Sequence, residues 1–154
     1  MPYLNIKLSG EPSREVQEDV ARTLTRLTGE LLGKKPELTA VVIEPVPARF
    51  WFVGGTSLDS MAASSFYLDI KITEGTNTKQ QKAAYIRGVF TALEELLGPL
   101  DEASYIVIHD VSADAWGYQG VTQEYRFIKA LNLQEVVEKQ PSRRRPQKPA
   151  CATI

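Results

Sequence analysis

An internal duplication constrains this chain more than any other feature of its sequence. Residues 67–71 read YLDIK and repeat residues 3–7, which read YLNIK, at an offset of 64 positions. Residues 95–98, ELLG, repeat residues 30–33 at nearly the same offset. Matches that recur at an almost constant spacing predict that the chain folds the same structural unit twice.

Each copy has the pattern of a strand, a helix and a second strand. Residues 3–8 alternate between apolar and polar, as half-buried strands do. Apolar residues at helical spacing follow until Gly33 and Pro36, and residues 39–46 are rich in β-branched residues. In the second copy, Thr78 and Gln81 form a capping box and residues 105–111 are the matching strand. The expected apolar helix faces are Val16, Val20, Leu24, Leu27 and Leu31 in the first copy, and Ala83, Ile86, Phe90, Leu93 and Leu97 in the second.

Two such units define a fold class and leave one surface to be explained. A helix that joins two strands of one sheet implies parallel, right-handed pairing within each unit. We therefore predict an α+β fold of duplicated β-α-β units, with a four-stranded mixed sheet and two helices on one face. The other face is too polar for a monomer core and too aromatic for plain solvent surface, so we expect an oligomer. It carries Tyr3, Asn5, Lys7, Tyr67, Asp69 and Lys71.

Size and charge limit the domain organisation and the partners. The 154 residues, 43% hydrophobic and 24% charged, predict a single domain over residues 1–140, with pseudo-repeats at 2–60 and 66–120 and an arm at 121–140. Residues 141–154 hold four of the 18 basic side chains and no acidic one, and their composition predicts a disordered basic tail. Without that tail, 14 basic face 19 acidic residues, which disfavours nucleic acid as a partner.

Membrane, metal and disulfide roles also find little support. No apolar run is long enough to span a membrane and no signal peptide is present, so a cytoplasmic location is expected. Cys151 is the sole cysteine and His109 the sole histidine, so we expect no disulfide, no metal site and no cofactor. Cys151 stands four residues from the end behind Arg143, Arg144 and Arg145, which is a weak prenylation pattern. A cytosolic tail without a lipid is the alternative.

Pro2 is the residue that points to chemistry. Removal of the initiator Met1 would leave Pro2 with a free secondary amine. An α-amino group titrates near about 7.7–8.0, and burial lowers its pKa by disfavouring the charged form. Pro2 can then be a neutral base at physiological pH, held by a strand that ties down the terminus. The alternative is that Pro2 is a second residue without a role.

These features resemble a known family. Pro2 after Met1, the duplicated β-α-β unit and residues 51–55 (WFVGG) resemble the tautomerase superfamily, which includes 4-oxalocrotonate tautomerase, over roughly residues 2–120. The duplication makes the chain similar to fused members, in which one chain supplies what two short subunits supply elsewhere. The resemblance implies a homotrimer and a catalytic Pro2 that moves a proton between an enol oxygen and carbon. It also implies arginines that bind the substrate carboxylate.

The chain departs from this family pattern at its cationic positions. Pro12 and Ala40 stand where the family has arginines, and neither is a cation. Phe66 stands in the second unit where Pro2 stands in the first, so each chain offers one base. Thr76 and Asn77 replace arginines of the dehalogenase branch, which argues against water activation on halogenated acids.

Five further residues are candidates for binding substrate. Arg49 is a replacement cation or a solvated edge residue, and Arg126 offers the same choice between a pocket and the surface. Trp51 and Trp116 occupy equivalent places in the repeat and line a pocket or pack at a core or interface. The Tyr105 hydroxyl donates to a substrate oxygen or is buried and hydrogen-bonded. His109 is a second acid/base or a strand histidine paired with a neighbour such as Asp110.

The resulting prediction is a cofactor-independent keto–enol tautomerase that acts on small 2-oxo or 2-hydroxy carboxylic acids through Pro2. The aromatic residues suggest a substrate with a flat or aromatic portion. The alternatives are a decarboxylase or hydratase that uses the same proline, and a non-catalytic trimeric binding protein similar to macrophage migration inhibitory factor. Loss of both family arginines favours the last alternative.

Overall fold

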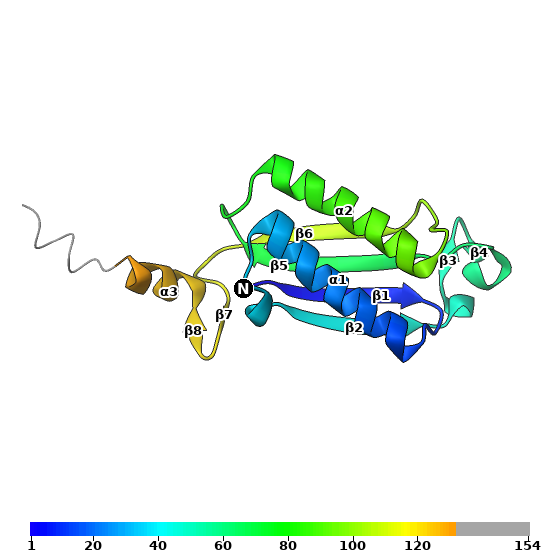
Figure 1. The fold of residues 1–154 in the computed structure, drawn as a ribbon, viewed down its shortest axis with the longest axis horizontal. Coiled ribbons are helices and arrows are strands. Elements are labelled where there is room, and N and C mark those ends of the chain that lie inside the picture. Colours follow the sequence, from blue (N-terminus) through cyan, green and yellow to red (C-terminus); the bar gives the residue numbers. More distant parts are fainter. Residues whose placement is uncertain (132–154) are drawn as a thin grey trace, which may run out of the picture.

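The computed structural model describes residues 1–131 and has a four-stranded sheet at its centre (Figure 1). The strand order is β2-β1-β5-β6, with parallel pairing of β1 with β2 and of β5 with β6, and antiparallel pairing of β1 with β5. The predicted duplicated β-α-β fold is therefore confirmed. The main elements are β1 (Tyr3–Ser9), α1 (Arg14–Leu32), β2 (Ala40–Val46), β5 (Phe66–Thr73), α2 (Lys79–Leu97) and β6 (Tyr105–Val111).

Both long helices begin and end where the sequence signals place them. The Ser13 side chain accepts a hydrogen bond from the Val16 backbone N–H, and Gly33 ends α1 with a φ of 65° that favours glycine. The predicted capping box of Thr78 and Gln81 is present at the start of α2. These caps fix the helix ends, and therefore the loops that lie beside the strand ends.

Alternation along the strands builds the core between the sheet and the helices. Both helices cover the same sheet face, as Figure 1 shows. The side chains that point from β1 and β5 toward them are fully buried, and each such aliphatic side chain contributes about 1.5–3 kcal/mol on burial. They are Leu4, Ile6, Leu8, Phe66, Leu68, Ile70 and Ile72.

The expected apolar face of α2 is confirmed in part. Leu93 is buried in the core, and Phe90 and Leu97 pack against it. Ala83 and Ile86 are wrong because both are exposed, whereas Tyr85 and Val89 are fully buried. The Tyr85 hydroxyl forms a buried 3.0 Å hydrogen bond with Thr28 of α1, so Tyr85 faces the core.

The opposite sheet face is left uncovered by the described residues. Asp69 lies near its centre, with its carboxylate 2.6 Å from His109 Nε2 and 3.2 Å from Lys71 Nζ. His109 pairs with a neighbour, as one alternative expected, but the partner is Asp69 and not Asp110, which pairs with Lys82 of α2. The face is polar, as predicted, and its Asp69, Lys71 and His109 side chains are paired within the chain.

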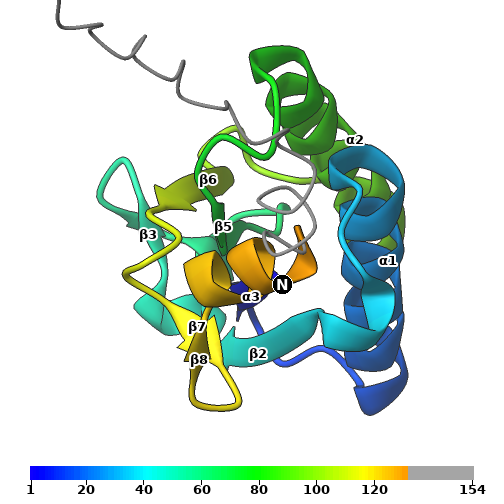
Figure 2. The same cartoon turned by 90° about the vertical axis from the view of Figure 1, so that its left-hand side faces the viewer.

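Two short hairpins lie at the two ends of the sheet. The first, β3 (Phe52–Val53) and β4 (Thr56–Ser57), follows β2. The second, β7 (Gly117–Tyr118) and β8 (Val121–Thr122), follows β6 and leads into α3 (Gln123–Ala130), within the predicted arm. Figure 2 views this end of the molecule, where α3 and the N-terminus lie. The rest of the arm and the predicted tail with Cys151 lie outside the described residues, and no helix among residues 1–131 is long and apolar enough to cross a bilayer.

Candidate active site

Three segments meet at the N-terminal end of β1. The antiparallel partner β5 ends beside Pro2, so residues 73–76 lie there. The parallel partner β2 starts beside Pro2, which brings in the α1–β2 loop. The chain beyond β6 then supplies the segment 112–131. Together they enclose a cavity of about 660 Å³, lined by Met1, Gly33, Lys34, Lys35, Leu38, Thr73, Glu74, Gly75, Thr76, Ala113, Tyr118, Gln123, Glu124, Arg126 and Phe127.

Pro2 comes directly after Met1, which lines this cavity, and Pro2 itself is not among the lining residues. Its ring is buried, and its carbonyl accepts a hydrogen bond from the Ala40 N–H over 3.3 Å. The preceding Met1 is half-buried, and its amine has a lowered pKa because of burial and then the charges of Lys34 and Lys35. A positive charge is therefore disfavoured where the chain starts.

Lys34 and Lys35 are site residues that the sequence analysis missed. Lys34 is half-buried, and its Nζ donates a 2.7 Å hydrogen bond to Thr76 Oγ1. Burial lowers the pKa of the Lys34 amine; Asp110 opposes this shift and Lys82 adds to it. The signal that could have found these residues is their place directly after Gly33, because the loop after that helix cap leads to the strand beside Pro2.

Arg126 lies on the other side of the cavity and is held by uncharged groups. Its Nη2 donates to the Tyr118 carbonyl over 2.9 Å and to Gln119 Oε1 over 3.3 Å, and its guanidinium lies 3.8 Å from the centre of the Tyr118 ring. No carboxylate of residues 1–131 lies within 4.0 Å of it. Arg126 is therefore a half-buried wall residue and not a solvated one.

The same segment holds three N–H donors that have no acceptor. They are Trp116 Nε1, Gln123 Nε2 and Arg126 Nε, all buried and without a hydrogen-bond partner in the described part of the chain. Of these residues, Gln123 and Arg126 line the cavity. Buried donors without an acceptor are uncommon in native proteins, since leaving one unpaired costs about 1–3 kcal/mol.

The cavity has a mixed charge with a cationic excess. Lys34, Lys35 and Arg126 carry positive charge, against Glu74 and Glu124. Both glutamates and Lys35 are exposed, whereas Lys34 and Arg126 are half-buried. Because water screens exposed charges more than buried ones, the interior of the cavity favours an anion.

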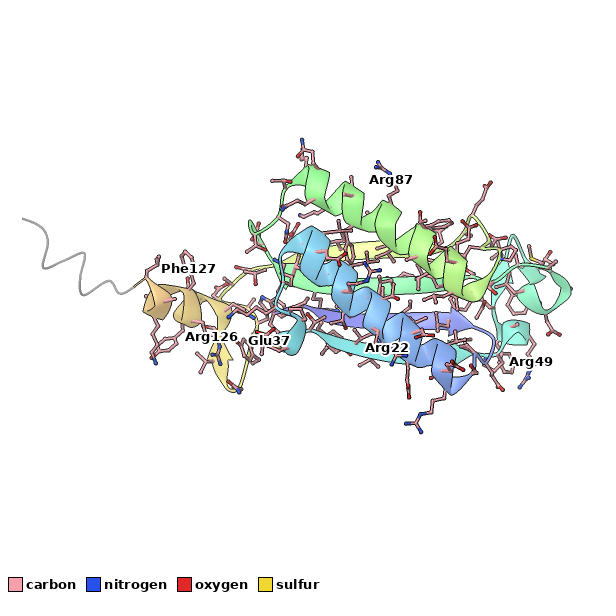
Figure 3. The ribbon with its side chains drawn as sticks, viewed as in Figure 1. Arg22, Glu37, Arg49, Arg87, Arg126 and Phe127 are labelled. Carbon is pink, nitrogen blue, oxygen red and sulfur yellow. The ribbon has the colours of Figure 1, made fainter. Side chains whose placement is uncertain are left out.

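Three of the predicted site residues lie at the far end of the same chain. The 3₁₀ turn Ala48–Phe50 follows β2 and carries Arg49, and Trp51 comes next. Tyr105 starts β6 beside Tyr67. The sheet is roughly 20 Å long between these ends. Figure 3 shows Arg49 and Arg126 at opposite ends of the molecule. Of the five residues predicted to bind substrate, Trp116 and Arg126 lie at the same end of the chain as Pro2.

Among residues 1–131, the far end holds no residue that could match a Pro2 amine. Arg49 is exposed and stacks on the Phe50 ring at 4.6 Å. The proposal of a buried Tyr105 is wrong for the single chain, since this side chain is 60% exposed. Phe66 takes the place of Pro2, fully buried, with its ring centre 6.2 Å from that of Phe90. Phe66 is therefore packed at this end, whereas the large apolar side chains of Phe50, Phe52 and Tyr105 stay exposed there.

Comparison with known proteins places both repeats in one family. A family model described as tautomerase enzyme matches residues 2–61 and again 67–125. The probable tautomerase K2 of Dickeya dadantii (strain 3937) is 32% identical over 59 residues, which is 38% of this chain and 88% of that protein.

Solved structures give the same fold. A native fused 4-OT is 22% identical with a TM-score of 0.72, covering 80% of this chain and 97% of that one. A fused 4-OT solved as an asymmetric trimer, F6, is 21% identical with a TM-score of 0.71, covering 80% and 98%. A macrophage migration inhibitory factor-like protein from Entamoeba histolytica is 21% identical with a TM-score of 0.66, covering 79% and 97%.

Proposed function

The chain belongs to the tautomerase family, and from that premise we propose that it is a keto–enol tautomerase of small 2-oxo or 2-hydroxy carboxylic acids. The observation that carries this proposal is the position of Pro2. It is buried directly behind Met1, which lines a cavity that has a cationic excess and holds Lys34 and Lys35. A tautomerase-type isomerase needs a base beside an anion-binding pocket, and this end of the sheet offers Pro2 as the candidate base and the two lysines as candidate anion-binding groups.

Pro2 becomes a base only when Met1 is removed. With Met1 attached, the Pro2 nitrogen belongs to an amide and has no basic lone pair. The free amine would lie one residue deeper than the Met1 amine, whose pKa burial and the two lysines already lower. The same causes would lower the pKa of the Pro2 amine, which favours the neutral state required to accept a proton.

Lys34 is proposed to bind the substrate carboxylate in place of the absent arginines. Its Nζ already donates to Thr76 on the opposite loop, so the ammonium is held at the cavity and keeps donors for an anion. Lys35 adds a second positive charge on the same wall. Neither lysine forms an ion pair with an acid in residues 1–131, so their charge is available to a ligand.

The proton then moves in two steps. The Pro2 nitrogen takes the proton of the enol hydroxyl while the electron pair shifts toward carbon, and the protonated amine returns a proton to that carbon. General acid–base catalysis of this kind contributes about 10²–10⁴ in rate. Positive charge near the developing keto oxygen and fixed substrate geometry supply further acceleration.

The test is an ultraviolet assay of ketonisation with phenylenolpyruvate and 2-hydroxymuconate. Protein whose intact mass shows that Met1 is absent should be active, with a rate that rises with pH through a group below the ordinary α-amino range. A variant that retains Met1 should lose nearly all of this activity. Full activity with Met1 attached would exclude Pro2 as the base and leave His109 as the next candidate.

We also propose a homotrimer, supported by the uncovered sheet face. The exposed Tyr3, Val42 and Tyr105 on that face need a partner, and trimeric assembly is stated for fused 4-OT structures of the same fold. A neighbouring copy would also bring the Arg49 and Trp51 end of one chain toward Pro2 of another. Light scattering at micromolar concentration should give the mass of three chains, and a stable monomer would refute this assembly.

A further inference from the structure

The loop between β5 and α2 reaches the cavity from the second repeat. β5 ends at Thr73, and the Thr76 N–H closes a turn by donating to the Thr73 carbonyl over 3.4 Å. Gly75 is the third residue of this turn and has a φ of 73°, a conformation that favours glycine. The turn brings Thr76 to the wall of the cavity, which Lys34 also lines.

Thr76 is held in place by bonds to two elements. Its hydroxyl donates to the Thr73 carbonyl at the end of β5 over 2.6 Å. The next residue, Asn77, donates from Nδ2 to the Leu32 carbonyl over 2.9 Å. Leu32 is the last residue of α1, and the last carbonyls of a helix have no partner within it. The loop of the second repeat is therefore bonded to the helix that leads into Lys34.

The contact between Thr76 and Lys34 orients a charge without neutralising it. An ammonium group has three N–H donors and no acceptor, so in the 2.7 Å hydrogen bond between Lys34 Nζ and Thr76 Oγ1 the threonine oxygen accepts. Two donors of the ammonium remain for a ligand. No carboxylate of residues 1–131 lies within 4.0 Å of Lys34 Nζ. The lysine is therefore fixed by an uncharged group and keeps its positive charge for an anion.

The equivalent positions at the other end of the sheet cannot form this contact. The ELLG repeat makes Lys34 correspond to Pro99, and the same offset makes Thr76 correspond to Glu11. A proline side chain has no hydrogen-bond donor. The lysine–threonine contact therefore belongs only to the end of the chain that has Pro2.

We propose that Thr76 is a positioning residue, which holds Lys34 in the orientation in which Lys34 binds the substrate carboxylate. This inference rests on the proposed function, which assigns that carboxylate to Lys34. A lysine side chain has many rotamers, and ordering it when a ligand binds lowers the affinity. The bond to Thr76 orders Lys34 before the substrate arrives, so this loss is met on folding. The second repeat, which has Phe66 in place of a base, thus contributes to the site of the first.

The test compares ketonisation of phenylenolpyruvate with that of its uncharged methyl ester, on the full chain without Met1. Thr76→Val removes the acceptor and keeps the shape of the side chain. It should lower kcat/KM for the acid by about 3- to 10-fold, mainly through KM, and leave the ester unchanged. Thr76→Ser keeps the hydroxyl and should retain the native values. Thr91→Val changes an exposed threonine of α2, is the matched control, and should alter neither substrate.

A double-mutant cycle tests whether Thr76 acts through Lys34. In the Lys34→Gln background the charge is absent, so Thr76→Val should cause no further loss with the acid. Losses that multiply in the double variant would overturn the inference, because Thr76 would then act by another route. Equal losses with the acid and the ester in Thr76→Val would also overturn it, since they indicate a general effect on the structure.

A binding measurement separates this inference from the proposed function. Phenylacetate has a carboxylate beside a flat ring, phenylacetamide is its neutral counterpart, and calorimetry gives the dissociation constants of both. If the same cycle is found for phenylacetate alone and no enol is ketonised, the positioning role is supported and the tautomerase proposal is removed. If enols are ketonised but the two residues show no coupling in either measurement, the positioning role is overturned and the tautomerase proposal remains.

Discussion

The two ends of the sheet are built from equivalent parts of the two repeats, yet they carry different residues. At one end, Pro2 directly precedes β1, and the loop after α1 continues from Gly33 into Lys34 and Lys35, which line the cavity. At the other end, β5 begins at Phe66 and the loop after α2 continues from Gly98 into Pro99 and Leu100. The fully buried Phe66 makes this second end a packed one at the position where the first, proposed reactive end has Pro2.

Backbone pairing closes the second end as well. Ser64 donates to the Pro99 carbonyl over 2.9 Å, and Asp101 donates to the Ser64 carbonyl over 2.8 Å. Ser65 and Ser9 add a side-chain bond of 2.8 Å. These bonds involve backbone on both sides of residue 65, so residues 64–66 lie inside a continuous chain. A basic proline amine exists only at the N-terminus. A single chain with two repeats therefore has one such amine, at Pro2, and the matching position in the second repeat can hold a structural residue.

The largest effect on this comparison is expected from Phe66→Ala. Removal of a fully buried phenylalanine ring costs about 3–5 kcal/mol of unfolding free energy. Pro2→Ala removes only a few atoms and keeps an amine, so it should cost little stability and leave partial activity. Urea unfolding of both variants, with the ketonisation assay, measures the two effects. Similar losses of stability in both variants would contradict the division into a packed and a reactive end.

The arrangement of strands and helices behind this comparison was predictable from the sequence, because it follows from local sequence patterns. Period-2 alternation set the inner faces of β1 and β5, and the caps at Ser13, Gly33 and Thr78 set the helix ends. The repeat then fixed which strands pair in parallel. Pro2 could be singled out as the candidate base because that proposal depends only on its position directly after Met1.

The rest of the site depends on which loops meet, and that is not local information. Lys34 lies in a loop after a helix cap, and only the register of β1 against β2 and β5 brings it to Thr76. Trp51 was a candidate through the resemblance and Arg49 as a replacement cation, but the parallel direction of β2 carries both to the other end of the chain from Pro2. Tyr85 was left out of the expected face of α2, and its hydroxyl partner, Thr28, belongs to the other repeat.

The second-largest effect is expected from Lys34→Gln. It removes the charge that follows Gly33 in the loop after α1, as the uncharged Pro99 follows Gly98 in the matching loop after α2. Loss of a charged hydrogen bond to the substrate carboxylate should lower kcat/KM by about 10- to 100-fold. Stability should change little, since Lys34 pairs with no acid in residues 1–131 and its burial disfavours the charge. Arg22→Gln on the exposed side of α1 is the matched control. Unchanged kinetics in Lys34→Gln would show that the two loops differ without a functional consequence.

The smallest effect at neutral pH concerns the contact that the two repeats share. Tyr85 of α2 and Thr28 of α1 form a buried hydrogen bond between the repeats, and Tyr85→Phe should cost about 1 kcal/mol near pH 7. The same burial raises the pKa of Tyr85 from 10.0 to about 12. Because the pKa is higher in the folded chain, the neutral hydroxyl stabilises the fold fully below pH 10, and this contribution is lost as the pH rises toward 12. The loss amounts to about 2–3 kcal/mol.

The unfolding free energies of the native chain and Tyr85→Phe, measured by urea titration between pH 7 and pH 12, should therefore converge as the pH rises. The variant begins less stable, but it has no phenol to ionise at this position, so its stability falls less steeply above pH 10. Tyr125→Phe changes an exposed tyrosine of α3 and should follow the native curve throughout. Parallel curves for the native chain and Tyr85→Phe would mean that the contact between the repeats opens before Tyr85 ionises. The helices of the two repeats would then separate in alkali while each sheet end keeps its own packing.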